Sequence, residues 1–199
     1  IRVEWSTLLT VVLGVVKDQR FTYQKALKQL LQLDPLVASM VELRNAAKAY
    51  NVYDVVVNEP DRDTILQLLF YVGVESQIGQ DVPCFIYDFP ASQAALARIS
   101  QQDTRVAERF EVYFKGIELA NGFHELADAK EQLSRFTADN NKRKTMGLRE
   151  QPIDHYLIDA LTAGFPDCAG VALGIDRLVM LATDANSLND VIAFPTPRA

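Results

Sequence analysis

The sequence predicts an α+β fold in which an antiparallel sheet is flanked by helices. The apolar pattern changes near residue 80, from helical spacing before it to strand-like runs after it. The second part also contains a dipeptide suited to a tight turn between two such runs, which is typical of an antiparallel hairpin. These features favour one domain over residues 1–199, mainly helical in 1–80 and built around a sheet in 83–199.

Four helices are expected before residue 80. The second carries leucines at helical spacing, and the fourth has an aspartate, Asp61 or Asp63, where an N-cap residue is favoured. A polar loop at 76–81 separates these helices from the strands. The expected helices span about 3–17, 23–33, 36–50 and 62–72.

Four strands are expected after the loop, with two helices between the last two strands and a further helix after the last. The helix at 128–146 is the best defined, because Asp128 and Glu131 form a capping-box pattern and Gly147 is suited to end it. The strands are expected at 84–87, 109–115, 117–126 and 168–175, with the helices 128–146 and 153–163 between the last two.

The composition favours a globular protein that does not span a membrane. Apolar residues make up 49% of the chain, which is enough for a core, and no long uncharged apolar run is present. The net charge of −6 argues against a nucleic-acid surface, and the basic run 142–144 suits the end of a helix. Cys84 and Cys168 lack metal-ligand spacing and are expected to be small buried residues in a reducing cytoplasm.

The stretch 170–178 is the most informative part of the chain. As a strand over 170–175, it would place Gly170, Ala172 and Gly174 on one nearly bare face and three branched aliphatic side chains on the other. Such a strand can bury one face in a core and leave the other open to a flat ligand. The alternative is an ordinary buried strand that leads into a helix.

The residues after this strand predict an anion-binding position. Asp176 suits an N-cap, which places Arg177 in the first turn of a helix. An arginine beside a helix N-terminus is suited to bind a phosphate group. In the alternative interpretation, Arg177 is an ordinary surface arginine.

A hairpin is expected around the turn at Lys115 and Gly116. With the turn centred there, Glu111 lies opposite Ala120 and Tyr113 lies opposite Glu118. Glu111 and Glu118 then project from one face, where their charges repel unless a cation lies between them. Mg²⁺ fits this arrangement, because it binds one or two carboxylates and keeps waters and phosphate oxygens as its other ligands.

Three further polar or aromatic residues follow on the second arm of this hairpin. Asn121, Phe123 and Glu125 share one face by alternation, but their parity is opposite to that of Glu118. A bulge near 120–122, which Gly122 suits, would bring all of these side chains to one side. The alternative is a solvated sheet face with scattered acids.

These stretches resemble known sequences. Residues 170–178 are similar to the third signature motif of class II aminoacyl-tRNA synthetases, and residues 118–126 resemble the amino-acid-binding segment of the lysyl type. The runs 89–97 and 105–194 resemble more closely the elongation factor P–(R)-β-lysine ligases, which are paralogues of lysyl-tRNA synthetases. The resemblance implies the C-terminal part of one class II synthetase-like catalytic domain.

The resemblance implies an ATP site. Glu111 and Glu118 correspond to carboxylates that hold ATP-bound Mg²⁺, and Arg177 corresponds to a catalytic arginine that contacts the γ-phosphate. Gly174 is implied to line the same ATP site. ATP and Mg²⁺ are therefore the expected cofactors.

The resemblance also implies a substrate pocket. Asn121, Phe123 and Glu125 correspond to lysine-pocket residues, with Glu125 as the expected partner of a substrate ammonium. A buried carboxylate–ammonium pair selects a lysine-like side chain, because a neutral competitor would leave the charge unpaired. Ala172 stands where lysyl-tRNA synthetases carry glycine, and its methyl is expected to reshape the pocket for β-lysine over α-lysine.

The implied activity is ATP-dependent activation of (R)-β-lysine as an adenylate, followed by transfer to a lysine of elongation factor P. Positioning and charge neutralisation can supply the catalysis, so no side chain is expected to act as a nucleophile. His124 and His155 are expected to have structural or surface roles. The full-length protein is expected to be a cytoplasmic homodimer that does not use tRNA.

Two signature motifs of the class are not found in these residues. They are motif one, which builds the dimer, and motif two, whose arginine holds the α-phosphate. Because both precede the matched region in the family, we expect the chain to be the C-terminal portion of a longer protein and to be inactive by itself. Two alternatives stay open: a fragment of a lysyl-tRNA synthetase catalytic domain, and a non-catalytic synthetase-like binding paralogue.

Overall fold

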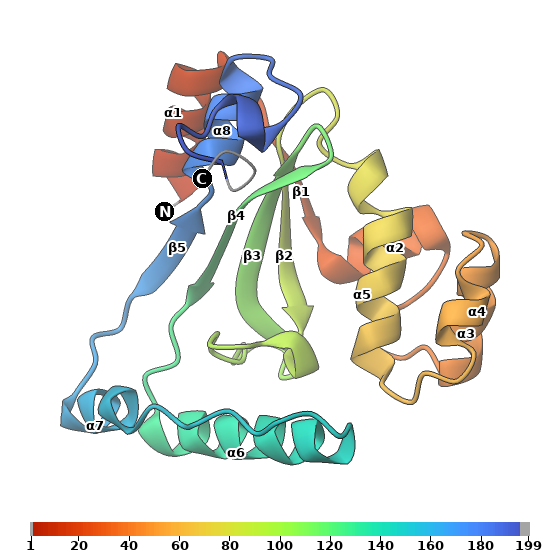
Figure 1. Cartoon of the computed structure of the whole chain (residues 1–199), viewed down its shortest axis with the longest axis vertical. Helices are drawn as coiled ribbons and strands as arrows, with labels where there is room; N and C mark the ends of the chain where they lie inside the picture. The colour runs from red at the N-terminus through yellow and green to blue at the C-terminus, as the bar shows by residue number, and fades with distance from the viewer. Residues whose placement is uncertain (1, 196–199) are drawn as a thin grey trace.

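The computed structural model describes the backbone of residues 2–195 and the side chains of residues 7–195. A five-stranded sheet forms the centre of the described part and helices pack on both of its faces, so the predicted α+β class is confirmed (Figure 1). The strands lie side by side in their order along the chain: β1 Gln19–Thr22, β2 Cys84–Pro90, β3 Val106–Phe114, β4 Ile117–His124 and β5 Ala169–Leu173.

The pairing between β2, β3, β4 and β5 is antiparallel, as the sequence predicts. The exception is β1, which pairs in parallel with β2. β1 lies within the portion predicted to be helical. Because it has four residues between two helices, it is too short to show the alternation that predicts a strand.

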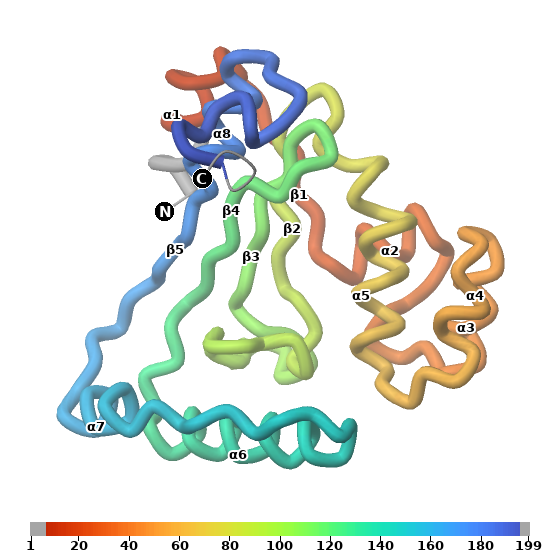
Figure 2. Tube along the Cα trace, viewed as in Figure 1, coloured from red at the N-terminus to blue at the C-terminus, as the bar shows by residue number. Residues whose placement is uncertain are grey.

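Helices form most of the remaining structure. α1 and α8 come from opposite ends of the sequence and pack against each other (Figure 2). The sequence analysis does not predict α4, which has only one turn. The helices are α1 Arg2–Leu13, α2 Tyr23–Leu31, α3 Met40–Lys48, α4 Tyr53–Val56, α5 Arg62–Gly73, α6 Ala129–Thr145, α7 His155–Ala163 and α8 Ile175–Ala182, with 3₁₀ turns at Glu75–Gln77, Ala91–Gln93 and Leu188–Asp190.

Capping residues explain where two of the predicted helices begin and end. Asp61 caps α5 through a hydrogen bond from a backbone N–H of the first turn. Asp128 caps α6, but the predicted capping box is not completed, because Glu131 forms an ion pair with Arg135 instead. Gly147 follows α6 with a φ of 71°, a conformation that favours glycine.

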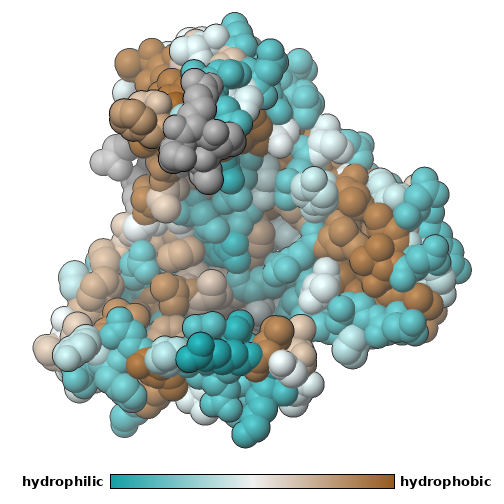
Figure 3. Space-filling view, in the orientation of Figure 1, coloured by the Kyte–Doolittle hydropathy of each residue, from teal (hydrophilic) through white to brown (hydrophobic). Residues whose placement is uncertain are grey.

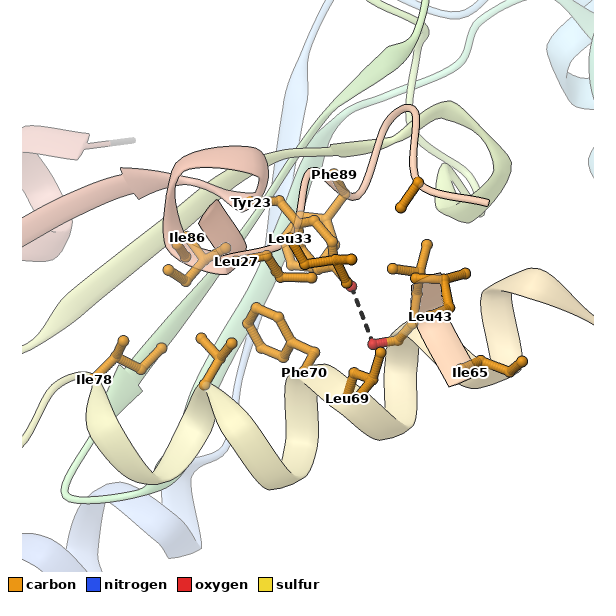
Figure 4. Packing of buried hydrophobic residues seen from close by; sticks show 14 of the residues in the cluster. Tyr23, Leu27, Leu33, Leu43, Ile65, Leu69, Phe70, Ile78, Ile86 and Phe89 are labelled. Carbon is orange, nitrogen blue, oxygen red and sulfur yellow. Dashed lines mark hydrogen bonds between the residues drawn. The ribbon is translucent and has the colours of Figure 1, made fainter. Parts of the chain in front are cut away.

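The larger part of the core lies between one face of the sheet and helices α2, α3 and α5 (Figure 4). Tyr23 stacks on Phe70 with ring centroids 4.9 Å apart, and Phe89 of β2 packs beside Tyr23 at 5.0 Å. The buried Tyr23 hydroxyl donates a hydrogen bond to the carbonyl of Leu66 at 3.4 Å. Further members of this core are Leu27, Leu33, Leu43, Ile65, Leu69, Ile78 and Ile86.

A smaller core covers the opposite face of the sheet. Leu9 of α1 and Leu178 of α8 pack there against Phe85, Val112 and Leu119. α6 and α7, here called the arm, lie after the end of β4 and before the start of β5, away from α1 and α8 (Figure 1). Figure 3 shows the surface hollowed between α8 and the arm, with hydrophilic atoms over the middle of the sheet. Among the described residues, no helix combines the length and the apolarity needed to cross a bilayer.

Candidate active site

A bulge in β4 determines which side chains share a face of the sheet. Val112 pairs with Ala120, but the next residue, Tyr113, pairs with Glu118, so Leu119 is an extra residue in β4. Leu119 and Ala120 are both buried in the core under α1 and α8. Consecutive residues of a regular strand point to opposite faces, so the bulge is what allows both to be buried together.

Two predictions about this hairpin are corrected. Glu111 lies opposite Asn121, not Ala120, because the bulge shifts the register by one residue. The predicted bulge is present, but it is at Leu119, next to the predicted range 120–122, and Gly122 lies outside it. Gly122 pairs regularly, and a Cβ atom at this position would lie 2.7 Å from the carbonyl oxygen of Gly170.

The shifted register brings the predicted site residues to one face of the sheet. Glu118 lies opposite Tyr113, and Tyr113 is two residues along β3 from Glu111, so the two carboxylates share a face. Asn121 lies directly opposite Glu111, and Phe123 is two residues further along β4. The opposite parity expected from the sequence is therefore removed by the extra residue.

β5 provides the nearly bare surface beside these side chains. Ala172 pairs with Asn121 and Gly170 pairs with Phe123, so both project to the face that carries the two carboxylates. Val171 projects to the opposite face, where it pairs with a residue of β4 that carries no side chain. The predicted division into a bare face and an aliphatic face holds over residues 170–173. The aliphatic face is not fully buried, however, because Val171 is 39% exposed.

The transition from β5 to α8 differs from the prediction. α8 begins at Ile175, so this residue belongs to the helix and the strand ends at Leu173. The N-cap is Gly174 rather than Asp176. The carbonyl of Gly174 already accepts the first helical hydrogen bond, from the N–H of Leu178 at 3.0 Å, which leaves no cap position for the aspartate.

Arg177 lies in the first turn of α8, as predicted, and contacts Glu118. Its guanidinium donates a hydrogen bond to the backbone carbonyl of Glu118 at 2.7 Å and lies 3.8 Å from the Glu118 carboxylate. The stem of the arginine lies over Gly174, where an added Cβ would be 3.2 Å from Arg177 Cδ. With 46% of its side chain exposed, Arg177 is accessible to a ligand.

Glu111 is the most buried charged residue of the site, with 7% of its surface exposed. Arg109 and Asn121 donate hydrogen bonds to Oε1, the latter at 3.3 Å, and the Tyr113 hydroxyl donates to Oε2. The ion pair with Arg109 offsets the cost of burying the carboxylate, since the arginine is itself only 17% exposed. These partners hold the carboxylate in one orientation.

A third carboxylate, Glu75, lies near these two and is missed by the sequence analysis. Burial, together with the charges of Glu111 and Glu118, raises the pKa of Glu75 to about 7. Burial and the charge of Glu111 also raise the pKa of Glu118. Glu75 begins the 3₁₀ turn after α5, and no motif or spacing in the sequence connects it with the hairpin.

The carboxylates of Glu111 and Glu118 fit the donor set that Mg²⁺ prefers. Mg²⁺ uses one or two protein carboxylates and completes its ligand shell with waters and phosphate oxygens. Among the described residues no group of three or more His, Cys, Asp or Glu side chains is placed to bind a metal. Burial and the nearby charge of Glu111 raise the pKa of Glu118, and Arg177 and Arg109 offset only part of this effect.

Further along the face lie the Glu125 carboxylate and the amide oxygen of Asn121, whose amide nitrogen bonds Glu111. Glu125 follows β4, and a Cβ added at Gly170 would lie 2.3 Å from Glu125 Oε1, which places this carboxylate over β5. Burial raises the pKa of Glu125. Asn121 Oδ1 is buried without a hydrogen-bond partner among the described residues. Both groups accept hydrogen bonds, so this end of the face is suited to an ammonium.

His124 points away from this face of the sheet, as the sequence analysis expects. Its Nε2 lies 2.6 Å from Asp167 and its Nδ1 bonds Glu108, so the imidazole joins β3, β4 and the segment before β5. Arg98 completes the cluster through an ion pair with Asp167 at 2.9 Å. These contacts give His124 a structural role.

The two cysteines are free thiols. Cys84 is buried in the core under α2 and α5, where burial raises the pKa of its thiol to about 12. Cys168 is only partly buried. The expectation of a small buried residue therefore holds for Cys84 and not fully for Cys168, which immediately precedes β5.

Three relatives show a high identity over most of the chain. Each carries the name elongation factor P–(R)-β-lysine ligase. The relative from Vibrio parahaemolyticus is 62% identical over 98% of this chain and 61% of its own length. Those from Photobacterium profundum and Salmonella arizonae are 60% and 59% identical, over 96% and 98% of this chain and 59% and 60% of their own lengths. The chain thus spans about three-fifths of the length of the curated relatives it matches.

The family model of class II tRNA synthetases for the D, K and N types matches residues 12–198. This match extends over the larger core, the whole sheet and every residue of the candidate site, and it begins near the end of α1. The antiparallel sheet, its bare last strand and the arginine in the first turn of α8 all lie within the matched range. The chain belongs to the class II tRNA synthetase family.

Proposed function

We propose that this chain forms the amino-acid pocket and part of the ATP site of a ligase that activates (R)-β-lysine and transfers it to a lysine of elongation factor P. The relatives that carry this name are 59–62% identical to nearly the whole chain. The family supports the use of ATP, because class II tRNA synthetases activate amino acids with it.

The observation that carries the proposal is the common face created by the bulge at Leu119. Glu118 lies at one end of this face and Glu125 at the other, with Asn121 between them along β4. Phosphate chemistry and ammonium recognition can therefore take place on one surface, a strand's length apart. A lysine-like substrate needs both, since its carboxylate must reach ATP while its amine is held elsewhere.

The end of the face that carries Glu125 selects the substrate. Glu125 has a pKa raised by burial, so its charge is poorly solvated and gains most from a cationic partner. The unpartnered Oδ1 of Asn121 adds a second acceptor. A neutral side chain at this place would leave a partly buried carboxylate unpaired, which is the basis of selection for a lysine-like molecule.

The end of the face that carries Glu118 and Arg177 binds ATP. Arg177 is placed by its contacts with Glu118 and Gly174, and its guanidinium is suited to a phosphate group. Glu111 and Glu118 would hold Mg²⁺, which when bound neutralises phosphate charge. Arg109, Tyr113 and Asn121 keep the Glu111 carboxylate oriented for that role.

The reaction then needs no nucleophile from the chain. A carboxylate oxygen of the substrate forms a bond to the α-phosphorus of ATP, and the bond to pyrophosphate breaks. A lysine amine of elongation factor P next attacks the acyl carbon, an amide forms, AMP leaves, and the amine loses a proton. The side chains contribute by holding the substrates in line and by balancing charge.

The test is ATP–pyrophosphate exchange by the full-length gene product with (R)-β-lysine or L-α-lysine, followed by the mass change of purified elongation factor P. We expect exchange with (R)-β-lysine and a mass increase of one lysyl group. The Glu125→Gln variant should keep only weak exchange, with a KM for (R)-β-lysine raised about tenfold or more. The Glu150→Gln variant, in the exposed loop between α6 and α7, should be unchanged. Exchange with neither isomer would contradict the proposal, and exchange without modification of elongation factor P would favour a tRNA synthetase.

A further inference from the structure

Gly170 lies against the carboxylate of Glu125. A Cβ atom built on Gly170 would meet Glu125 Oε1 at 2.3 Å, well inside the 3.0 Å that real Cβ atoms essentially never pass. The Glu125 Cδ atom is at 3.5 Å, so the contact is with the carboxylate end of the side chain and not with its stem. The carboxylate therefore occupies the volume that a methyl group at position 170 would need.

Backbone conformation does not explain the glycine. The glycines with positive φ in the described part are 14, 79, 116, 147 and 164, and Gly170 is not among them. It lies in a regular ladder opposite Phe123, where any residue could adopt the same φ and ψ. Ala172, two residues further on the same face, carries a methyl group. Position 170 therefore lacks a side chain because the Glu125 carboxylate needs that space.

The backbone of Glu125 cannot shift to make room. Its N–H donates to the carbonyl of Cys168 at 3.0 Å. On its two sides, Arg98 donates its N–H to the His124 carbonyl at 2.8 Å, and Leu126 donates to the Leu96 carbonyl at 3.0 Å. With the main chain held from both neighbouring segments, only the Glu125 side chain can move.

We propose that Gly170 is a positioning residue, which leaves the space that fixes where the Glu125 carboxylate receives the substrate ammonium. This inference rests on the proposed function, since it assigns Glu125 to the ammonium. A methyl group at 170 would push the carboxylate toward the open side of the pocket. The atom displaced is the far end of a flexible side chain, so the fold tolerates the change and the effect falls on the substrate.

The experiment compares Gly170→Ala with wild type in the full-length gene product, by adenylate formation with (R)-β-lysine. We expect the KM for (R)-β-lysine to rise about tenfold or more, while the KM for ATP stays within about twofold. The matched control is Ala169→Val, which adds methyl groups to the neighbouring, exposed position on the opposite face of β5 and should leave both constants unchanged.

A second comparison asks whether Gly170 acts through Glu125. In a Glu125→Gln background, where the ammonium partner is already lost, Gly170→Ala should change the KM by less than about twofold. An equal effect in both backgrounds would overturn the inference. So would an unchanged KM for (R)-β-lysine in the Gly170→Ala variant of an active enzyme.

Two further outcomes are distinguishable. If wild type forms no adenylate with either lysine isomer, the proposed function fails, not the role of Gly170. If Gly170→Ala is unfolded by circular dichroism, the double variant Gly170→Ala/Glu125→Ala is measured. Removal of the side chain that the methyl meets should restore the fold, and failure to restore it would overturn the inference.

Discussion

Ala172 lies directly opposite Asn121 in the β4–β5 ladder, and the two side chains project to the same face. On the bare face of β5, its methyl group is the side-chain atom closest to the amide acceptor of the pocket, since the next position on that face is a glycine. Moving an amino group from the α to the β carbon shifts a charge by about one bond length, so one methyl at this place matters.

We therefore predict that Ala172→Gly relaxes discrimination between the lysine isomers. The ratio of kcat/KM for (R)-β-lysine to that for L-α-lysine should fall by an amount equivalent to about 1–3 kcal/mol, while the KM for ATP is unchanged. Adenylate formation with each isomer measures this. An unchanged ratio would show that the methyl does not contact the substrate.

Tyr113→Phe should destabilise the protein by about 1–3 kcal/mol, because it removes a hydrogen-bond donor from a buried carboxylate. Tyr113 is 2% exposed and donates to Glu111 Oε2, while its ring packs 5.8 Å from that of Phe70. The variant keeps the ring and loses only the hydroxyl. Urea unfolding gives the free energy of unfolding.

The matched control for this variant is Tyr156→Phe. Tyr156 is 89% exposed, so loss of its hydroxyl should change the free energy of unfolding by less than about 0.5 kcal/mol. Equal changes for both variants would mean that the hydrogen bond to Glu111 contributes nothing to stability.

The raised pKa of Glu75 predicts a decline in stability as the pH rises. Its pKa of about 7 in the folded state lies above the ordinary value of 4.5, so between these values the folded state binds more protons than the unfolded state. The free energy of unfolding must then fall with rising pH across this window. Glu75→Gln should remove that part of the decline, as urea unfolding at a series of pH values would reveal. The same pH dependence of the free energy of unfolding in wild type and Glu75→Gln would contradict this prediction.

His124 predicts a second pH effect, at higher pH. The hydrogen bonds that the imidazole makes to the carboxylates of Asp167 and then Glu108 raise the pKa of His124 above its ordinary value of 6.5. The contribution of His124 to the free energy of unfolding is fully present below pH 6.5, and it is lost as the pH rises through the raised pKa of the folded state. His124→Asn should therefore flatten the stability curve above pH 6.5, and NMR titration of the imidazole after Asp167→Asn should give a lower pKa. An imidazole pKa unaffected by Asp167→Asn would contradict the assignment.

The elements that the sequence predicts well are those whose signals are local. The turn of the hairpin is one, because Lys115 and Gly116 both adopt positive φ and the chain must reverse there. α6 is another, since Asp128 and Gly147 mark its ends. In these places the preferred conformation of one or two residues is sufficient to determine the structure.

The features that the sequence does not predict depend on packing between distant segments. Leu119 became the bulged residue because the core under α1 and α8 accepts it together with Ala120, which no local pattern reveals. Glu75 joins the site only because α5 packs beside the sheet. Ile175 continues an apolar alternation yet starts α8, since Gly174 already serves as the cap. The chemistry of the site could be anticipated from residue types, but its geometry required the fold.

The insertion of the arm between β4 and β5 has a consequence for the order in which the protein assembles. β3 and β4 are joined by a tight turn, whereas β4 and β5 meet across a long excursion, as the His124–Asp167 bond over 43 positions shows. Closing a long loop costs more entropy than closing a short one, and such pairings form slowly. The hairpin should thus acquire amide protection from hydrogen exchange before β5 does, so that the newly made chain carries its carboxylates in place before it can receive a substrate.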